Sequence, residues 1–289
     1  MRRSLFTLAA LAALAGCAVI VVPDNGDVQF KSAFSGNAVQ GNGQSVVENR
    51  EIGNLDEVDI NGPMQVEIRV GQSAALQLEG DSNILPLVRT DARGGTLRVW
   101  IEGSVRTSTP LRLTYSTPVL RSVQTNGSGQ MQINGLNGAP LTLALNGSRA
   151  VRVSGRVSRL DARLNGSGGL DASGLESGAT AARLNGSGRL TLGRVNGESL
   201  NLELHGSGGA SASASGNVRS MTVRLNGSGS ADLAALTSQS AELSTNGSGS
   251  ISAAVTDAVV ATANGSGQVT VYGHPSQRTV SGKRVNIVQ

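Results

Sequence analysis

The sequence predicts an all-β protein of the parallel β-helix or β-solenoid class, with rungs of roughly 20 residues. An Asn-Gly-Ser-Gly motif, or a near variant, returns at steps of 18 to 21 residues between positions 126 and 267. Apolar and polar residues alternate on both sides of each motif, which is the pattern of a strand with one buried face. No segment after residue 16 has helical periodicity, so the sequence predicts no helix outside the first 16 residues.

Residues 1–16 are predicted to be a lipoprotein signal peptide. Two arginines precede an apolar run between Leu5 and Ala15 that is too short to span a bilayer. The run ends in Leu14-Ala15-Gly16-Cys17, which resembles the lipobox of bacterial lipoproteins. The resemblance implies cleavage before Cys17 and lipid attachment at its thiol, so the membrane is an expected partner. An ordinary secretory signal followed by a chance cysteine is the alternative.

Charge and cysteine content limit the partners further. Loss of the two N-terminal arginines lowers the formal charge from +4 to +2, so the mature chain is only mildly basic and we expect no nucleic-acid partner. Cys17 is the only cysteine, so no intramolecular disulfide can form. Residue 18 is alanine, not aspartate, which by resemblance to lipoprotein sorting implies the outer membrane.

Two segments precede the regular repeats. Residues 17–51 are polar and rich in glycine, asparagine and serine, so we interpret them as a lipidated tether. Residues 52–125 contain alternating runs around Asn61-Gly62-Pro63, a degenerate form of the later motif. They are predicted to form irregular first coils or a β cap.

Residues 126–272 are predicted to be the regular solenoid. Asn and Gly tolerate positive φ, which a sharp corner needs. Equal coils stack in parallel, so we expect the first residues of the motif to form a hydrogen-bonded structural ladder, each about 4.8 Å from the next. A hairpin meander also uses Asn-Gly, but gives no reason for a constant period. The ladder positions are Asn126, Asn146, Asn165, Asn185, His205, Asn226, Asn246 and Asn264.

The fifth and seventh residues after each ladder position are apolar in every repeat, which predicts buried columns. The 39 glycines and the 2% aromatic content also fit a disordered segment, but a flexible linker has no reason to keep this alternation. The expected buried pairs are Met131/Ile133, Val151/Val153, Leu170/Ala172, Leu190/Leu192, Ala210/Ala212, Ala231/Leu233, Ile251/Ala253 and Val269/Val271.

Residues 273–289 are predicted to be a C-terminal cap. Pro275 breaks the period, and Lys283 and Arg284 add charge close to the end. A solenoid needs capped ends because an open last rung exposes unpaired strand edges.

Several ordered motifs resemble the head GIN domain family, a domain of unknown function labelled as an auto-transporter adhesin. They are the run 55–62 (Leu-Asp-Glu-Val-Asp-Ile-Asn-Gly), the runs 65–68 and 118–123, the repeated Asn-Gly-Ser-Gly turns and the closing 271–275 and 280–282. Residues 52–289 carry the resemblance. It implies a β-helical protein that is secreted or attached to the envelope, and it brings no catalytic residues.

A carbohydrate-active β-helix enzyme is the main alternative, and it would need carboxylates that converge from neighbouring rungs. Asp171 and Asp232 share a column but lie three rungs apart, and Asp161 and Glu242 lie four apart. The only histidines are His205, in the ladder, and His274, in the closing turn. We therefore expect no catalytic residues, cofactor or metal site.

One surface column suggests binding. Arg163, Arg183, Glu203 and Arg224 should point outward from successive rungs, with Arg149, Arg152 and Arg189 near the same corner. An arginine face would bind an anionic glycan, lipopolysaccharide or another envelope component. The favoured alternative is a solvated ladder in which Glu203 relieves the repulsion between its neighbours.

These features together predict a lipid-anchored protein of the bacterial envelope with a non-enzymatic, adhesin-like or structural binding role. A periplasm-facing scaffold shares every sequence feature with an adhesin and differs only in the side of the outer membrane that it faces.

Overall fold

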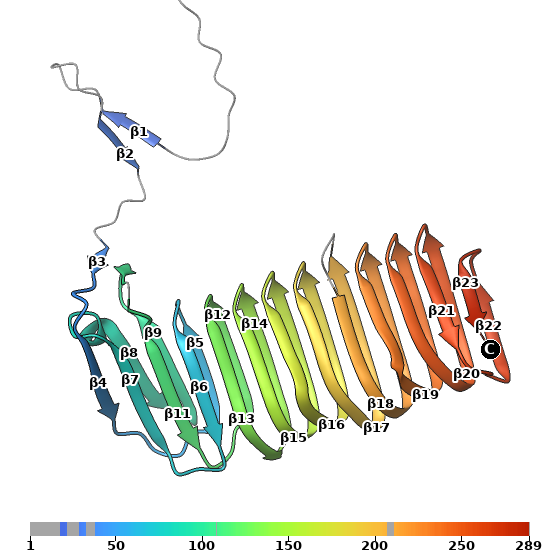
Figure 1. Ribbon diagram of the computed structural model, residues 1–289, viewed down its shortest axis with the longest axis horizontal. Helices are drawn as coiled ribbons and strands as arrows, with labels where there is room; N and C mark the ends of the chain where they lie inside the picture. Colours follow the sequence, from blue (N-terminus) through green and yellow to red (C-terminus); the bar gives the residue numbers. More distant parts are fainter. Residues whose placement is uncertain (1–17, 22–28, 33–37, 108, 207–210, 289) are drawn as a thin grey trace, which may run out of the picture.

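A computed structural model describes residues 18–21, 29–32, 38–107, 109–206 and 211–288; the predicted signal peptide and Cys17 lie outside them. The body is an elongated parallel β-solenoid, which confirms the predicted fold class (Figure 1). The elements of the described chain are β1 Ala18–Val21, β2 Gln29–Ser32, β3 Val39–Gln40, β4 Ser45–Arg50, β5 Glu57–Asn61, β6 Gln65–Val70, β7 Ala75–Asp81, η1 Leu85–Leu87, β8 Val88–Arg93, β9 Thr96–Ile101, β10 Val105–Arg106, β11 Arg112–Thr117, β12 Ser122–Gly127, β13 Gln130–Gly138, β14 Leu141–Gly147, β15 Ala150–Gly166, β16 Gly169–Gly186, β17 Arg189–Gly206, β18 Ser211–Gly227, β19 Ser230–Gly247, β20 Ser250–Gly265, β21 Gln268–Tyr272, β22 Gln277–Ser281 and β23 Val285–Val288. Strands β1 and β2 pair with each other, and β3 pairs with β10, outside the sheet of the solenoid.

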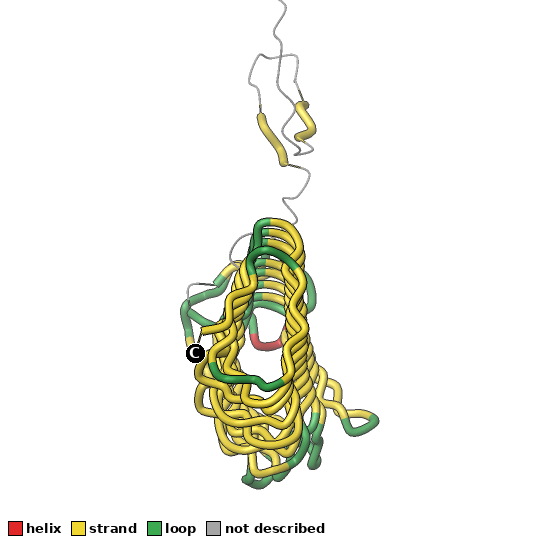
Figure 2. Tube along the Cα trace, turned by 90° about the vertical axis from the view of Figure 1, so that its right-hand side faces the viewer, coloured by secondary structure: helices red, strands yellow, loops and turns green. Residues whose placement is uncertain are grey.

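Two long sheets form the sides of a flattened coil (Figure 2). Face A contains β4, β7, β11, β6, β13, the first parts of β15 to β20, β21 and β23, in that spatial order. Face B contains β8, β9, β5, β12, β14, the second parts of β15 to β20, and β22. The long strands β15 to β20 bend from one face to the other, so each of them supplies nearly a whole rung.

The core is a set of columns of aliphatic side chains between the two faces. Strand alternation places every second residue inside, and the parallel register places like positions on top of one another. Val123, Leu143, Ala162 and Leu202 belong to one such column on face B, and all are buried. The predicted pairs after each corner are buried too, with one exception.

The exception lies in the rung of His205. Arg189 pairs with Ser211 and Leu190 pairs with Ala212, so the buried positions of this rung are Ala212 and Ala214. The predicted pair Ala210/Ala212 is therefore displaced by two residues, and Ala210 itself lies outside the described residues. The constant-spacing prediction failed here because Ser211 lies six positions after His205, whereas its partner Ser230 lies four positions after Asn226.

The N-terminal end of the stack is irregular and closed. The rung β5–β6 lies between the rung β9–β11 and the rung β12–β13, so the chain order and the spatial order differ. Strands β4 and β8 run antiparallel to β7 and β9 and form the outermost strands of the two faces. The 3-10 turn η1 buries Leu85 at this end. Strand β4 begins at Ser45, within the range predicted as a tether.

Arg50 ties the two faces together at the N-terminal end. Its Nη1 donates to the carbonyl of Val88 (2.7 Å), its Nη2 donates to the carbonyl of Leu85 (3.3 Å), and its Nε donates to Glu48 (2.9 Å). The side chain is 17% exposed. It thus crosses from β4 on face A to β8 and η1 on face B and satisfies carbonyl groups at the closed end.

The C-terminal end has a different construction. Strand β22 pairs in parallel with β20, and β23 pairs in parallel with β21, so residues 277–288 continue both faces by one short rung. All residues of β22 and alternate residues of β23 are exposed. The described residues contain no further strand or turn that covers this rung.

Candidate functional site

The corner between faces B and A is the most regular feature of the surface. The glycine after each ladder asparagine has positive φ, as in Gly147 (110°) and Gly166 (122°). No described residue other than glycine has positive φ, so the expectation that asparagine also adopts it is wrong. Asparagine stays extended as the last outward residue of face B, and the glycine makes the bend.

The glycine is required for a second reason. A Cβ built on Gly147 would lie 2.5 Å from the carbonyl oxygen of Gly127 in the preceding rung. Backbone bonds link the corners in the same place, since the Ser148 amide donates to that carbonyl (3.1 Å). Glycine at this position therefore allows adjacent corners to stack at hydrogen-bonding distance.

The asparagine side chains form a continuous series of amide hydrogen bonds in most of the stack. Each Nδ2 donates to Oδ1 of the preceding rung, as from Asn146 to Asn126 (2.9 Å) and from Asn165 to Asn146 (2.9 Å). The bonds from Asn185, Asn246 and Asn264 repeat this at 2.9, 3.1 and 2.9 Å. The series starts one rung earlier than predicted, because Asn126 donates to Asn61 (2.7 Å).

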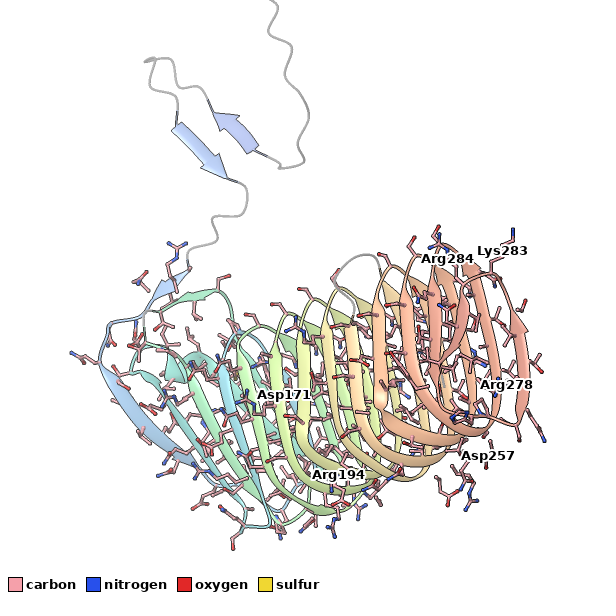
Figure 3. The ribbon with its side chains drawn as sticks, turned by 45° about the vertical axis from the view of Figure 1, so that its right-hand side comes forward. Asp171, Arg194, Asp257, Arg278, Lys283 and Arg284 are labelled. Carbon is pink, nitrogen blue, oxygen red and sulfur yellow. The ribbon has the colours of Figure 1, made fainter. Side chains whose placement is uncertain are left out.

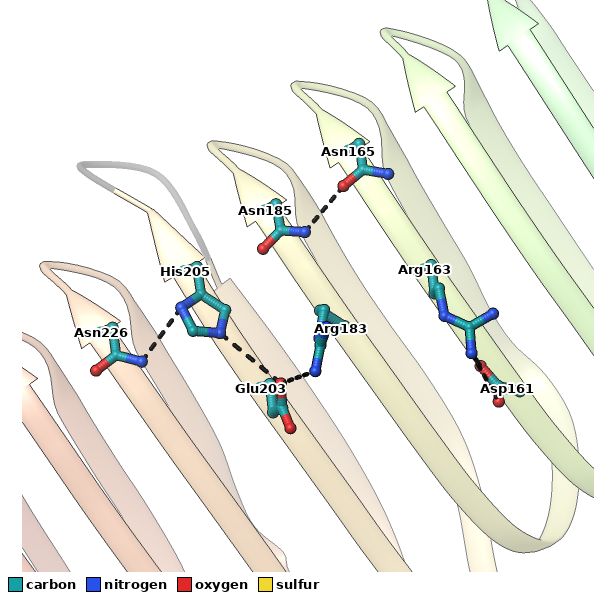
Figure 4. A network of polar contacts seen from close by, with 8 residues as sticks. All are labelled: Asp161, Arg163, Asn165, Arg183, Asn185, Glu203, His205 and Asn226. Atoms are coloured by element: carbon teal, nitrogen blue, oxygen red, sulfur yellow. Dashed lines mark hydrogen bonds and ion pairs between the residues drawn. The ribbon is translucent and has the colours of Figure 1, made fainter.

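His205 changes the pattern within the ladder (Figure 4). It lies in register with Asn185 and Asn226, and Nδ2 of Asn226 donates to its Nδ1 (3.2 Å). An accepting Nδ1 places the ring proton on Nε2, which faces a carboxylate oxygen of Glu203 at 3.8 Å. The histidine thus accepts a hydrogen bond from the next rung as an asparagine would, while its Nε2 faces Glu203 of the charged column.

The charged column lies beside the ladder on face B. Arg163, Arg183, Glu203 and Arg224 are in register on four successive rungs, as the spacing predicts. Each arginine contacts a carboxylate: Arg183 pairs with Glu203, Arg163 with Asp161 (3.3 Å) and Arg224 with Glu242 (3.0 Å). About half of each guanidinium side chain is exposed. The strip is therefore charge-balanced and accessible to solvent.

A shallow hollow lies over this strip. Asp161, Ala181 and Asn201 share one outward column, and Arg163, Arg183 and Glu203 share the next one. The floor is low at Ala181 because its side chain is shorter than those on the rungs before and after it. The hollow brings guanidinium, carboxylate and amide groups together on one open surface.

The other three arginines of the predicted face do not join it. Arg149 is 2% exposed, and its guanidinium points into the corner, where Nη1 donates to Met64 (2.5 Å) and Nη2 to Gly62 (2.6 Å). Burial lowers the pKa of Arg149 to about 10. Arg152 lies on face A and pairs with Asp171 (3.1 Å), and Arg189 begins β17 on face A.

Sequence reasoning placed Arg149 on the surface because a charged residue in a turn is normally solvated. The available signal was its position in a column otherwise held by glycine, as at Gly129 and Gly168. A Cβ on Gly129 would lie 2.7 Å from the Met64 carbonyl oxygen and 3.6 Å from Nη1 of Arg149, so it is the close approach of Met64 that requires glycine there.

The geometry also bears on catalysis. Asp161 and Glu203 flank the hollow, but two rung steps separate them, roughly 9.6 Å along the stack, and they occupy different columns. Each carboxylate already contacts an arginine. The paired carboxylates of glycosidases face one bond from its two sides, whereas Asp161 and Glu203 lie in different columns and each contact an arginine. Within the described ranges, no three His, Cys, Asp or Glu residues gather as metal ligands do.

The predictions about the membrane mostly concern residues that lie outside the described part of the chain. Cys17, the expected lipid attachment site, is not among the described residues. In the described part of the chain, no helix is long and apolar enough to cross a bilayer.

Comparison with known proteins gives one family and several related folds. The family model described as "Putative auto-transporter adhesin, head GIN domain" matches residues 54–210 and 175–275. A crystal structure of a "putative lipid binding protein" from Parabacteroides distasonis is 20% identical, with a TM-score of 0.65 over 87% of this chain and 100% of that chain.

Two further crystal structures have a similar fold. A "putative adhesin" from Parabacteroides merdae is 19% identical, with a TM-score of 0.62 over 87% of this chain and 99% of its own. Another from Parabacteroides distasonis is 17% identical, with a TM-score of 0.61 over 87% and 100%. At these identities the likeness concerns the fold alone. None of the curated proteins compared with the chain matches it.

Proposed function

The chain belongs to the head GIN domain family, and from this membership we propose that it is a lipid-anchored envelope protein with a non-enzymatic, adhesin-like role. Face B is the binding surface in this proposal. The observation that carries it is the strip of Arg163, Arg183 and Arg224, held in register with Glu203 on successive rungs beside an open hollow.

An extended polymer is the ligand that fits such a surface. The strip repeats its polar groups at the rung spacing of about 4.8 Å, and it is open along the stack rather than closed around a small molecule. A linear chain of sugar units can contact several rungs at once, so weak contacts at each rung add up through multivalency. The family description and the names of the similar structures, adhesins and a lipid-binding protein, support attachment over catalysis.

The ligand class in this proposal is an anionic glycan. A guanidinium that contacts one carboxylate retains further donors for a sulfate, phosphate or uronate group. Exposed ion pairs contribute little free energy, so a ligand anion can displace Asp161 or Glu242 at small cost. Because the carboxylates balance the charge of the strip, we expect weak binding that decreases with added salt.

The anchor completes the proposal. Acylation at Cys17 would hold the protein at the outer membrane, and the segment that precedes β4 would hold the solenoid away from the lipid. Incorporation of a labelled fatty acid tests this directly. We expect the label in the wild-type protein and none in Cys17→Ser.

A binding assay tests the surface. Polygalacturonate, a uronate polymer, would be immobilised, with uncharged dextran as the reference polymer. We expect wild-type protein to bind polygalacturonate and the variant Arg163→Ser/Arg183→Ser/Arg224→Ser to lose most of that binding. The matched control is Arg69→Ser/Arg93→Ser/Arg121→Ser, which removes three other exposed, paired arginines. Equal losses in both variants would remove the strip of Arg163, Arg183 and Arg224 as the site.

Orientation decides between an adhesin and an internal envelope scaffold. Protease treatment of intact cells, with a tag placed after Gln289 and lysed cells as control, measures it. Loss of the tag from intact cells supports attachment outside the cell. Protection until lysis would contradict the adhesin-like role and leave the periplasm-facing scaffold.

A further inference from the structure

The last rung of the solenoid exposes two strand edges. Strand β22 pairs with β20 and strand β23 pairs with β21, and among the described residues neither has a partner on its outer side. Backbone donors and acceptors along these outer edges are therefore available to another strand. The two edges continue the two faces, so an added strand could pair with β22 or β23 in the way that these strands pair with β20 and β21.

The same rung leaves its inward-facing residues uncovered. Val280 is in register with Ala261 of a core column, yet it is 45% exposed because no later rung in the described part of the chain covers it. Val285 and Ile287 continue the columns of Val269 and Val271 and are partly exposed. A strand added to this end from another molecule would bury these aliphatic groups.

Cations surround the uncovered end. The sequence contains no aspartate or glutamate after Asp257, whereas Arg278, Lys283 and Arg284 all lie in the last rung (Figure 3). Arg278 replaces an aliphatic residue in a core column, in register with Val259, and donates from Nε to the Pro275 carbonyl (2.6 Å). Arg284 donates from Nη1 to the Ser266 carbonyl (3.0 Å), and Lys283 is exposed.

A second copy of this chain does not fit the end. Two C-terminal ends would bring like charges together, which destabilises such a contact. The N-terminal end offers no acidic complement, because β4 contains one acid and one base, and β8 contains one acid and two bases. That end is also closed by η1 and by the hydrogen bonds of Arg50.

We propose that the C-terminal end binds an extended acidic segment of another protein by strand addition. Backbone hydrogen bonds to the edge of β22 or β23 give the pairing, alternate apolar residues of the segment cover Val280 and Ile287, and its acidic residues face Arg278, Lys283 and Arg284. An anionic membrane surface would use the cations and the aliphatic groups but leave the strand edges unpaired. The peptide strand uses all three features.

Binding of defined peptides to the purified full-length protein tests the proposal. The probe is a short acetylated, fluorescent peptide of alternating glutamate and valine, measured by anisotropy. We expect it to bind, and a peptide of alternating lysine and valine not to bind. The variant Arg278→Glu/Lys283→Glu/Arg284→Glu should weaken binding at least about tenfold. Lys283→Glu alone, at an exposed turn, should weaken it measurably without affecting folding.

Two controls separate strand addition at this end from charge attraction elsewhere on the protein and from binding through side chains alone. The variant Arg69→Glu/Arg93→Glu/Arg121→Glu makes the same change of charge far from this end and outside the strip of Arg163, Arg183 and Arg224, and it should leave peptide binding unchanged. A glutamate-valine peptide with N-methylated backbone amides cannot form strand hydrogen bonds and should bind much less. Equal binding of the methylated peptide would overturn strand addition.

Two other results would assign the end to a different occupant and overturn the proposal. One is self-association of the wild-type protein in sedimentation velocity that the C-terminal triple variant abolishes. The other is binding to phosphatidylglycerol vesicles, lost in the same variant, with no binding of the acidic peptide.

Discussion

The two ends of the solenoid terminate the same two sheets in different ways. At the N-terminal end, the outermost strands β4 and β8 are antiparallel to their neighbours, η1 covers the core, and Arg50 bonds both faces. At the C-terminal end, β22 and β23 repeat the parallel rung, and nothing among the described residues follows it. A parallel rung does not terminate its own sheets, so closure needs residues that break the pattern, and among the described residues these lie at the N-terminal end.

The comparison also shows what charges do at each end. Arg50 is enclosed by carbonyl groups and a carboxylate, so it holds the structure together. Arg278, Lys283 and Arg284 are exposed beside free strand edges, where cations hinder pairing with like-charged ends. Contacts within the chain close the first end, whereas the second end leaves its cations and strand edges exposed, as the proposed binding of an acidic strand requires.

The largest effect is expected between the ends, where each corner is stacked on both sides. Gly147→Ala places a Cβ 2.5 Å from the Gly127 carbonyl at a positive φ, so we expect a loss of about 3 kcal/mol or more of unfolding free energy. Gly43, near the closed end, also has positive φ but no atom within 4 Å of a Cβ, so Gly43→Ala should cost about 1 kcal/mol. Denaturant unfolding measures both. Similar losses would show that the stacked corner is not restrictive.

Two arginine substitutions, one at each end, compare how much a side chain stabilises the closed end and the open end. Arg50→Met removes bonds to two carbonyls and a carboxylate, so we expect it to cost about 2–3 kcal/mol. Arg278→Met removes one carbonyl bond from an exposed residue and should cost less than about 1 kcal/mol. Thermal melts of the two single variants suffice, and a larger loss for Arg278→Met would reverse the proposed roles.

Two tyrosines give a smaller contrast. Tyr115, near the closed end, is fully buried and donates to the Leu55 carbonyl (2.6 Å), whereas Tyr272, near the open end, is 41% exposed. We expect Tyr115→Phe to cost about 1–1.5 kcal/mol and Tyr272→Phe to have little effect.

Burial also raises the pKa of Tyr115. Above pH 10 the unfolded chain then releases its proton before the folded chain does, so this tyrosine destabilises the fold as the pH rises from its unfolded pKa toward its folded pKa. The pH dependence of unfolding measures this contribution. Its presence in wild type and its absence in Tyr115→Phe is the expected result, and an identical alkaline slope in both proteins would contradict it.

The smallest expected effect on stability is the difference between a substitution in the middle of the ladder and one at its C-terminal member. Asn165 donates to Asn146 and accepts from Asn185, so Asn165→Ala should cost about 1 kcal/mol. Asn264 donates to Asn246, at the end of the series, and Asn264→Ala should cost about half as much. Equal melting temperatures for these variants and the wild type would mean that the ladder bonds add no net stability.

Much of the repeat could be predicted from the sequence because its signals are local. The period gives the register, alternation gives the buried columns, and the spacing places Arg163, Arg183 and Arg224 on one face. The N-terminal closure could not be predicted in this way. The pairing of β4 with β7 and the position of β5–β6 join segments that no periodic signal connects.

Details of the corner depended on atoms that a repeat pattern does not specify. Asparagine and glycine both tolerate positive φ, and only the structure shows that glycine alone adopts it among the described residues. The burial of Arg149 depends on the carbonyls of Gly62 and Met64, which lie far away in the chain. The shift from Ala210/Ala212 to Ala212/Ala214 follows from one longer corner.

Native-state hydrogen exchange tests the contrast between the ends most directly. Mass spectrometry of peptides from β22 and β23 would be compared with peptides from β7 and β9, in the full-length protein and without denaturant. We predict exchange at least about a hundredfold faster at the C-terminal end, because local opening there uncovers one exposed rung, whereas the N-terminal strands open only with the closure around Arg50. Equal protection at the two ends would contradict an open C-terminal rung.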